Sequence, residues 1–143
     1  MTSEKAPRVR NINPSELAPA KGFSHASVGG GRVWLGGQIG CDSGGRIQMR
    51  HDIGAQFQAA IRNVGTALAA AGCEPTDVVK ITYYVTDLPA YRAALKTIGQ
   101  SYREVFGHHY PATTLVGVSA LFHPDALIEI DCVALSPEEA RHA

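Results

Sequence analysis

Apolar residues recur at helical spacing between Asp52 and Ala71. They follow one another at steps of three or four residues, which places them on one face of a helix; they are Ile53, Phe57, Ile61, Val64 and Leu68. Asp52 is a suitable N-cap and Gly72 a suitable C-terminal stop. The pattern therefore predicts an amphipathic helix whose apolar face packs on a core.

A second helical pattern begins after Asp87, with Pro89 in its first turn and Gly107 at its end. Its apolar stripe consists of Tyr91, Leu95, Ile98, Tyr102 and Val105. We expect one continuous helix from this segment.

Five stretches rich in β-branched or aromatic residues predict strands; they are residues 23–28, 32–37, 78–86, 113–120 and 127–135. The first two flank a run of three glycines, which is a hairpin signal. Strands and helices mixed in this order predict an α+β fold, a single mixed sheet with two helices on one face. We expect one domain over residues 13–143, preceded by a flexible polar tail at residues 1–12.

The last predicted strand divides its side chains between two kinds of surface, because successive strand residues point to opposite faces. Ile128, Ile130, Cys132 and Ala134 share one face, and Leu127, Glu129, Asp131 and Val133 share the other. Charges inside a strand need a partner or a task. The second face is therefore expected to carry chemistry or to meet another subunit.

Composition and residue spacing argue against several classes of protein. A chain of 143 residues with net charge +0 suits one domain and gives no electrostatic argument for a nucleic-acid partner. No apolar run is long enough for a membrane span, and the N-terminus does not resemble a signal peptide. The widely spaced Cys41, Cys73 and Cys132 indicate reduced thiols in a cytoplasmic protein. No Cys-x-x-Cys or His-x-x-x-His spacing occurs, so we predict no metal site.

Five segments resemble the Rid family, the reactive intermediate imine and enamine deaminases, also called YjgF-like proteins. They are NPSELAPAKGFSHA, GGQIG, NVGTALAAAGCEPTDVVKITYYVTD, YPATTLVGV and LIEIDCVAL. The resemblance implies a chorismate-mutase-like fold and a homotrimer with clefts between subunits. It also implies a small-molecule substrate, an enamine or imine such as 2-aminoacrylate that is hydrolysed to a keto acid and ammonia. No metal or organic cofactor is implied.

The resemblance also implies roles for particular residues. Glu129 matches the acidic residue that positions the attacking water. Phe23, Gly37, Gln38 and Tyr102 match residues that line the cleft.

Thr113 stands where active members of the family carry an arginine that binds the substrate carboxylate. A bidentate, charge-assisted contact of that kind is worth about 1.5–3 kcal/mol, and one neutral hydroxyl does not replace it. Weak or absent 2-aminoacrylate deaminase activity is the expected consequence, unless Thr113 contacts a different substrate or another cation takes over. The candidate cations are Arg32, Arg103, His109 and His123, of which His109, close before Pro111, is the preferred substrate-binding residue.

Alternatives to these roles stay open. Glu129 is either the water-positioning base or an interfacial carboxylate, and Asp131 is better explained by a contact between subunits than by catalysis. Tyr102 also fits the core stripe of its helix. The chain as a whole is either a hydrolase of an imine, enamine or related C–N substrate, or a non-enzymatic, ligand-binding or regulatory trimer.

Overall fold

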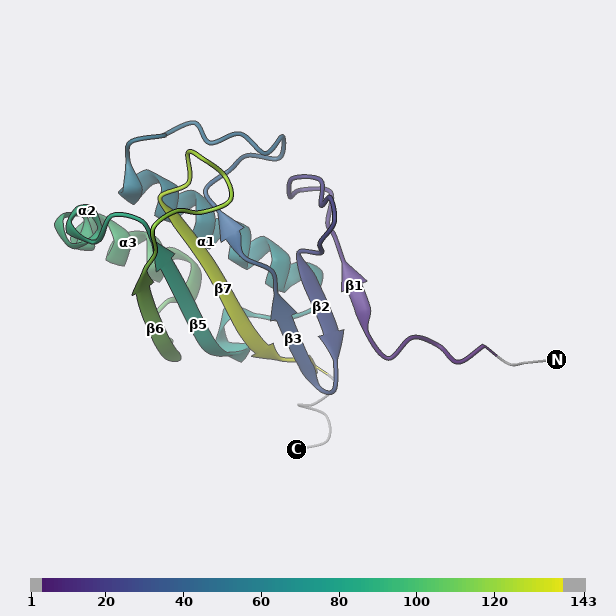
Figure 1. The fold of residues 1–143 in the computed structure, drawn as a ribbon. Helices are drawn as coiled ribbons and strands as arrows, with labels where there is room; N and C mark the ends of the chain where they lie inside the picture. The colour runs from purple at the N-terminus through teal and green to yellow at the C-terminus, as the bar shows by residue number, and fades with distance from the viewer. Residues whose placement is uncertain (1–3, 138–143) are drawn as a thin grey trace.

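The last strand, β7 (Ile128–Leu135), is the centre of the sheet in the computed structural model, which describes residues 4–137 (Figure 1). On one side β7 pairs antiparallel with β5 (Val78–Val85). On its other side it pairs with both β3 (Arg32–Leu35) and β4 (Gln38–Ile39). Because both of its edges are paired, β7 holds the two halves of the sheet together.

The outer strands complete a mixed sheet. β2 (Ala26–Gly29) forms the hairpin with β3, and β1 (Arg10–Ile12) pairs with β2 at one edge. β6 (Ala112–Gly117) pairs parallel with β5 at the other edge. The predicted α+β class and single mixed sheet are confirmed.

The sheet extends into the segment that we expected to be a flexible tail. Arg10, Asn11 and Ile12 pair with β2, and Ser27 Oγ donates a hydrogen bond of 2.7 Å to Asn11 Oδ1. Backbone pairing needs no apolar side chain, which is why the polar composition of this segment concealed the strand. Parts of the predicted ranges, residues 1–3 and 138–143, lie outside the described residues.

The first predicted helix is confirmed as α1 (Ile53–Ala70). Asp52 Oδ1 accepts a hydrogen bond of 3.0 Å from the backbone N–H of Ala55, as expected of an N-cap. A short 3₁₀ turn, η1 (Pro75–Asp77), then leads into β5.

The second predicted helix is in fact two, α2 (Leu88–Ala93) and α3 (Leu95–Phe106). Asp87 caps α2 as predicted, by accepting a hydrogen bond from the N–H of Ala90. The backbone leaves helical geometry at Ala94, where ψ is 9°. The prediction of one continuous helix was wrong because the apolar spacing runs on across this break.

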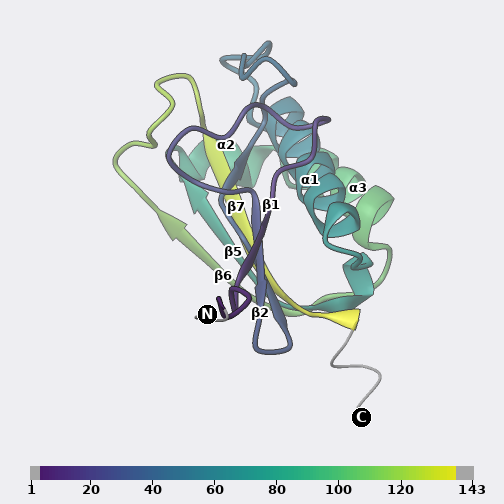
Figure 2. The same cartoon turned by 90° about the vertical axis from the view of Figure 1, so that its right-hand side faces the viewer.

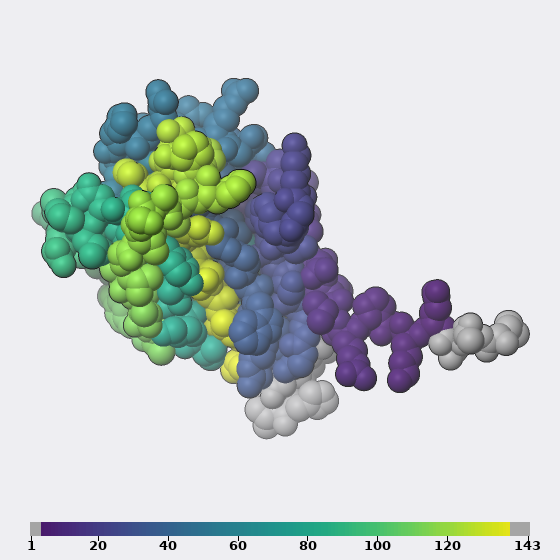
Figure 3. All heavy atoms as spheres, viewed as in Figure 1, coloured from purple at the N-terminus to yellow at the C-terminus, as the bar shows by residue number. Residues whose placement is uncertain are grey.

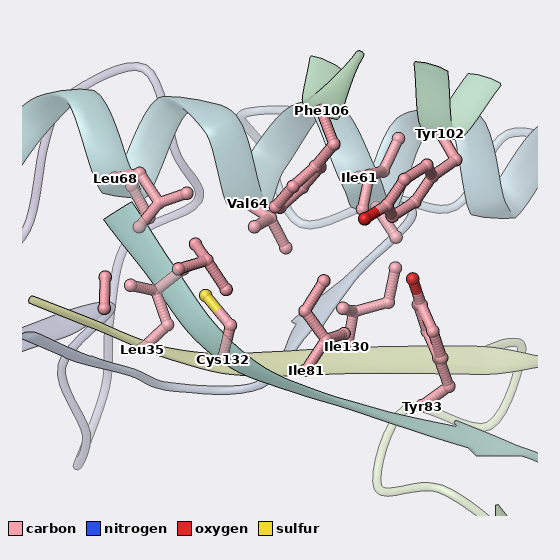
Figure 4. Packing of buried hydrophobic residues seen from close by; sticks show 14 of the residues in the cluster. Leu35, Ile61, Val64, Leu68, Ile81, Tyr83, Tyr102, Phe106, Ile130 and Cys132 are labelled. Carbon is pink, nitrogen blue, oxygen red and sulfur yellow. The ribbon is translucent and has the colours of Figure 1, made fainter. Parts of the chain in front are cut away.

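The helices cover one face of the sheet and leave the other open (Figure 2). Figure 4 shows the covered side, where side chains of β5 and β7 meet those of α1 and α3. The predicted alternation along β7 is confirmed: its four inward residues Ile128, Ile130, Cys132 and Ala134 are all buried. The open face carries Glu129, Asp131 and Val133 with Trp34, whose side chain is 54% exposed. Among the described residues, no helix has the length and apolarity to cross a bilayer.

Replacing Ile130 with alanine should lower the free energy of unfolding by about 2–5 kcal/mol, because a fully buried side chain would leave a cavity. Urea unfolding followed by circular dichroism measures the loss. Val79→Ala is the matched control on β5; its side chain is 44% exposed, so its effect should stay within about 0.5 kcal/mol. Equal losses in the two variants would contradict this description of the core.

Candidate functional site

A cavity of about 460 Å³ lies where three loop regions meet beside β7. Its walls come from residues 18–25, from residues 36–45 and from the β6–β7 connection together with Glu129. Figure 3 shows that connection, in yellow-green, reaching across the sheet toward the N-terminal loops. We call this space the Glu129 cavity. It contains four of the predicted site residues, Phe23, Gly37, Gln38 and Glu129.

The Glu129 side chain lies against Gly37. β4 brings them together because Ile39 is the register partner of Glu129. An ideal Cβ atom at residue 37 would lie 2.6 Å from Cδ of Glu129, far inside van der Waals contact. Glycine at position 37 therefore provides the space that the carboxylate occupies.

Glu129 is a carboxylate in a partly dry, negatively charged environment. Burial raises the pKa of its carboxyl group, and the nearby charge of Asp131 raises that pKa further. Asp131 itself accepts a hydrogen bond of 3.2 Å from the Tyr84 hydroxyl. Among the described residues, no donor bonds to the Glu129 carboxylate, so its oxygens are free to bind a water molecule or a ligand.

Gln38 is fixed by a chain of buried hydrogen bonds. Its Nε2 lies 3.1 Å from Nδ1 of His25, whose Nε2 lies 2.7 Å from the carbonyl oxygen of Ala18. Both contacts are satisfied when His25 carries its proton on Nε2 and accepts from Gln38 on Nδ1. His25 is a site residue that the sequence analysis missed, because a single histidine before a strand has no diagnostic spacing.

Phe23 lies at the mouth of the Glu129 cavity. Its ring meets that of His25 edge to face, with centroids 5.3 Å apart, and its side chain is 55% exposed. An exposed aromatic ring beside a cavity can cover a bound ligand.

Thr113 and Tyr102 lie at a different cavity, of about 260 Å³, between the β6 edge and the helices. We call it the aromatic cavity. Thr113 is the register partner of Ile81, which is buried under the helices, so Thr113 points to the helical side. Glu129 points to the open side. One copy of the chain therefore does not bring Thr113 and Glu129 together.

The four candidate cations lie in different surroundings. Arg32 bonds to the carbonyl oxygen of Gly31 in the β2–β3 hairpin, and His109 lies 2.8 Å from the Val78 carbonyl oxygen through Nε2. Neither lines the two cavities, so the substrate-binding role of His109 stays a prediction. His123 lines the Glu129 cavity, and Arg103 lines the aromatic cavity.

To hold a metal ion, several side chains in the described part of the chain would have to lie close together. Within residues 4–137, no three side chains of histidine, cysteine, aspartate or glutamate converge as metal ligands would.

The fold and this cavity define a class of small α+β proteins with a partly buried carboxylate beside a glycine, here Glu129 and Gly37. The family model described as endoribonuclease L-PSP matches residues 13–136. The chain belongs to this family, which is the Rid family.

Known relatives agree with that assignment. A human 2-iminobutanoate/2-iminopropanoate deaminase is 30% identical over 122 residues, covering 85% of this chain and 83% of that protein. A RutC family protein of Pyrococcus horikoshii is 33% identical over 121 residues, which cover 85% of this chain and 90% of that protein. The crystal structure of a Rid family protein of Yersinia pestis superposes with a TM-score of 0.78 at 28% identity. The match covers 89% of this chain and 98% of that protein.

Asp131→Asn should lower the pKa of Glu129, because it removes the neighbouring negative charge that disfavours ionisation. At any acidic pH, a larger fraction of Glu129 would then be ionised. Carbon-13 NMR of the labelled carboxyl group across a pH titration measures the shift. Glu104→Gln on the surface of α3 is the control and should leave the titration unchanged; an unchanged pKa in Asp131→Asn would refute the coupling.

Proposed function

We propose that this chain hydrolyses an imine, enamine or related C–N substrate, with Glu129 orienting the attacking water. The observation that carries the proposal is the Glu129 carboxylate, partly buried beside Gly37 with its oxygens free of other donors among the described residues. Relatives described as imine deaminases, about 30% identical over most of the chain, support the same chemistry.

The reaction needs only water and proton transfers. The imine nitrogen first takes up a proton from solvent. Glu129 accepts a proton from the water as the water oxygen bonds to the imine carbon, and it passes that proton to the amine nitrogen of the tetrahedral adduct. The C–N bond then breaks and its electron pair leaves with nitrogen as ammonia, while the hydroxyl oxygen gives its proton to the free Glu129 carboxylate and becomes the carbonyl oxygen; Glu129 finally releases that proton to ammonia or solvent. An enamine enters this route after protonation of its carbon has converted it to the imine.

The proposed site lies between subunits of a homotrimer. Thr113 and Glu129 face opposite sides of the sheet, so a cleft that uses both requires two copies of the chain. The open face adds a reason for assembly, because it combines the exposed Trp34 with Val133 and two carboxylates.

A non-enzymatic, ligand-binding or regulatory trimer is the second candidate. Thr113 favours it, because its hydroxyl, which bonds at 2.9 Å to the carbonyl oxygen of Pro111, gives a substrate carboxylate no counter-charge.

Glu129→Gln should reduce keto-acid release from imino acids by about a hundred- to ten-thousand-fold, because the amide cannot accept the proton of water. An amino-acid oxidase generates the imino acids in the assay, and keto acid above the spontaneous rate is measured. Glu104→Gln is the matched control and should keep full activity. Equal activity in wild type and Glu129→Gln would overturn the assigned role.

Thr113→Arg separates the two candidate functions. It should lower KM for small 2-imino acids about ten- to a hundred-fold, because a guanidinium binds the carboxylate directly. The same oxidase-coupled assay gives kcat and KM. No turnover in either wild type or Thr113→Arg would reject the hydrolase and favour the ligand-binding trimer.

A further inference from the structure

The aromatic cavity is lined largely by aromatic side chains. Phe57 and Tyr83 lie with ring centroids 5.7 Å apart, and Tyr102 and Tyr110 stack at 5.4 Å with only 10° between their planes. In Figure 4, Tyr83 rises from β5 toward Tyr102 of α3. Aromatic side chains around a space of about 260 Å³ suit one small ring better than a long or branched chain.

The Tyr83 hydroxyl is accessible at this cavity and has no partner among the described residues. Tyr83 is 6% exposed and lines the cavity, and no described residue hydrogen bonds to its hydroxyl. Burial raises its pKa well above the usual range, so the phenol stays neutral. Because its oxygen is accessible, this neutral hydroxyl is available to a ligand or to water in the cavity.

Arg103 brings a positive charge to the same space. Of the described residues that line the aromatic cavity, it alone carries a formal charge. The adjacent Glu104 pairs with Arg62, and Arg103 forms no salt bridge with any described residue. Its guanidinium lies over Gly99: an ideal Cβ atom at that glycine would be 3.1 Å from Nη1. The missing side chain at residue 99 therefore leaves the room in which the guanidinium lies.

We propose that Arg103 binds the substrate carboxylate and that the aromatic cavity binds a ring on the substrate side chain, so that the preferred substrates are 2-imino acids with an aromatic side chain. This inference rests on the proposed function and names the substrate class of that site. A ring between the aromatic walls leaves the carboxylate at Arg103 and the imine carbon near Thr113. A second copy of the chain would bring its Glu129 to that carbon.

Binding tests the ligand class without any turnover. Isothermal titration calorimetry should detect 3-phenylpropanoate binding to the wild type, with butanoate and neutral 3-phenylpropanol binding more weakly. Arg103→Gln should weaken 3-phenylpropanoate binding about ten- to a hundred-fold, because the charge-assisted contact is lost. Arg92→Gln, on α2 and outside the cavity, is the matched control and should bind as the wild type does.

A second variant, at Gly99, keeps the charge of Arg103 and fills the space in which its guanidinium lies. Gly99→Leu suits a helix interior, so thermal stability should be retained. Its side chain would displace the guanidinium and occupy the mouth of the cavity, so 3-phenylpropanoate binding should fall. Unchanged binding in both Arg103→Gln and Gly99→Leu would overturn the inference.

Kinetics then separates this inference from the proposed function. With imino acids made from phenylalanine and from alanine, the wild type should prefer the former, and Arg103→Gln should raise KM with little change in kcat. If the wild type hydrolyses both equally and Arg103→Gln changes neither KM, the substrate class is wrong while the hydrolase stands. If 3-phenylpropanoate binds through Arg103 but no imino acid is hydrolysed, the hydrolase is wrong and the assigned ligand class holds.

Discussion

The alternation of side chains along β7 is the constraint on which the rest of the structure depends. Ile128, Ile130 and Cys132 must face the helices, because the core between sheet and helices is built on them. Strand geometry then leaves Glu129 and Asp131 no position except the open face. The same requirement that stabilises the fold thus places two carboxylates on a surface that helices do not cover. Burial and, to a smaller extent, the neighbouring charge of Asp131 then raise the pKa of Glu129.

A single sheet separates the two halves of the proposed site. The Glu129 cavity belongs to the loops and the open face, whereas the aromatic cavity belongs to the helices and the β6 edge. A substrate held in the second cavity can reach the first only across a contact between copies. Assembly and catalysis are therefore linked in this proposal: a chain unable to associate would keep its ligand pocket and lose its water-positioning carboxylate.

Elements governed by side-chain periodicity could be predicted from the sequence. The helix from Ile53 and the inward face of β7 follow directly from spacing. The break at Ala94 and the strand β1 could not be predicted, because they depend on backbone conformation and backbone pairing, which leave the apolar pattern unchanged. Among site residues, resemblance located Glu129 and Gly37, but the hydrogen bond of His25 with Gln38 and the position of Arg103 over Gly99 arise only from tertiary packing.

The contact between Gly37 and Glu129 also limits how this sequence can change over evolution. A Cβ atom at position 37 would overlap the carboxylate in its present position, so a larger residue there requires the Glu129 side chain to turn away or to be replaced by a shorter one. A change at position 37 therefore acts on the position of the carboxylate as well as on the backbone. A lineage that acquires a larger residue at position 37 has, by that change alone, given up the present position of its glutamate.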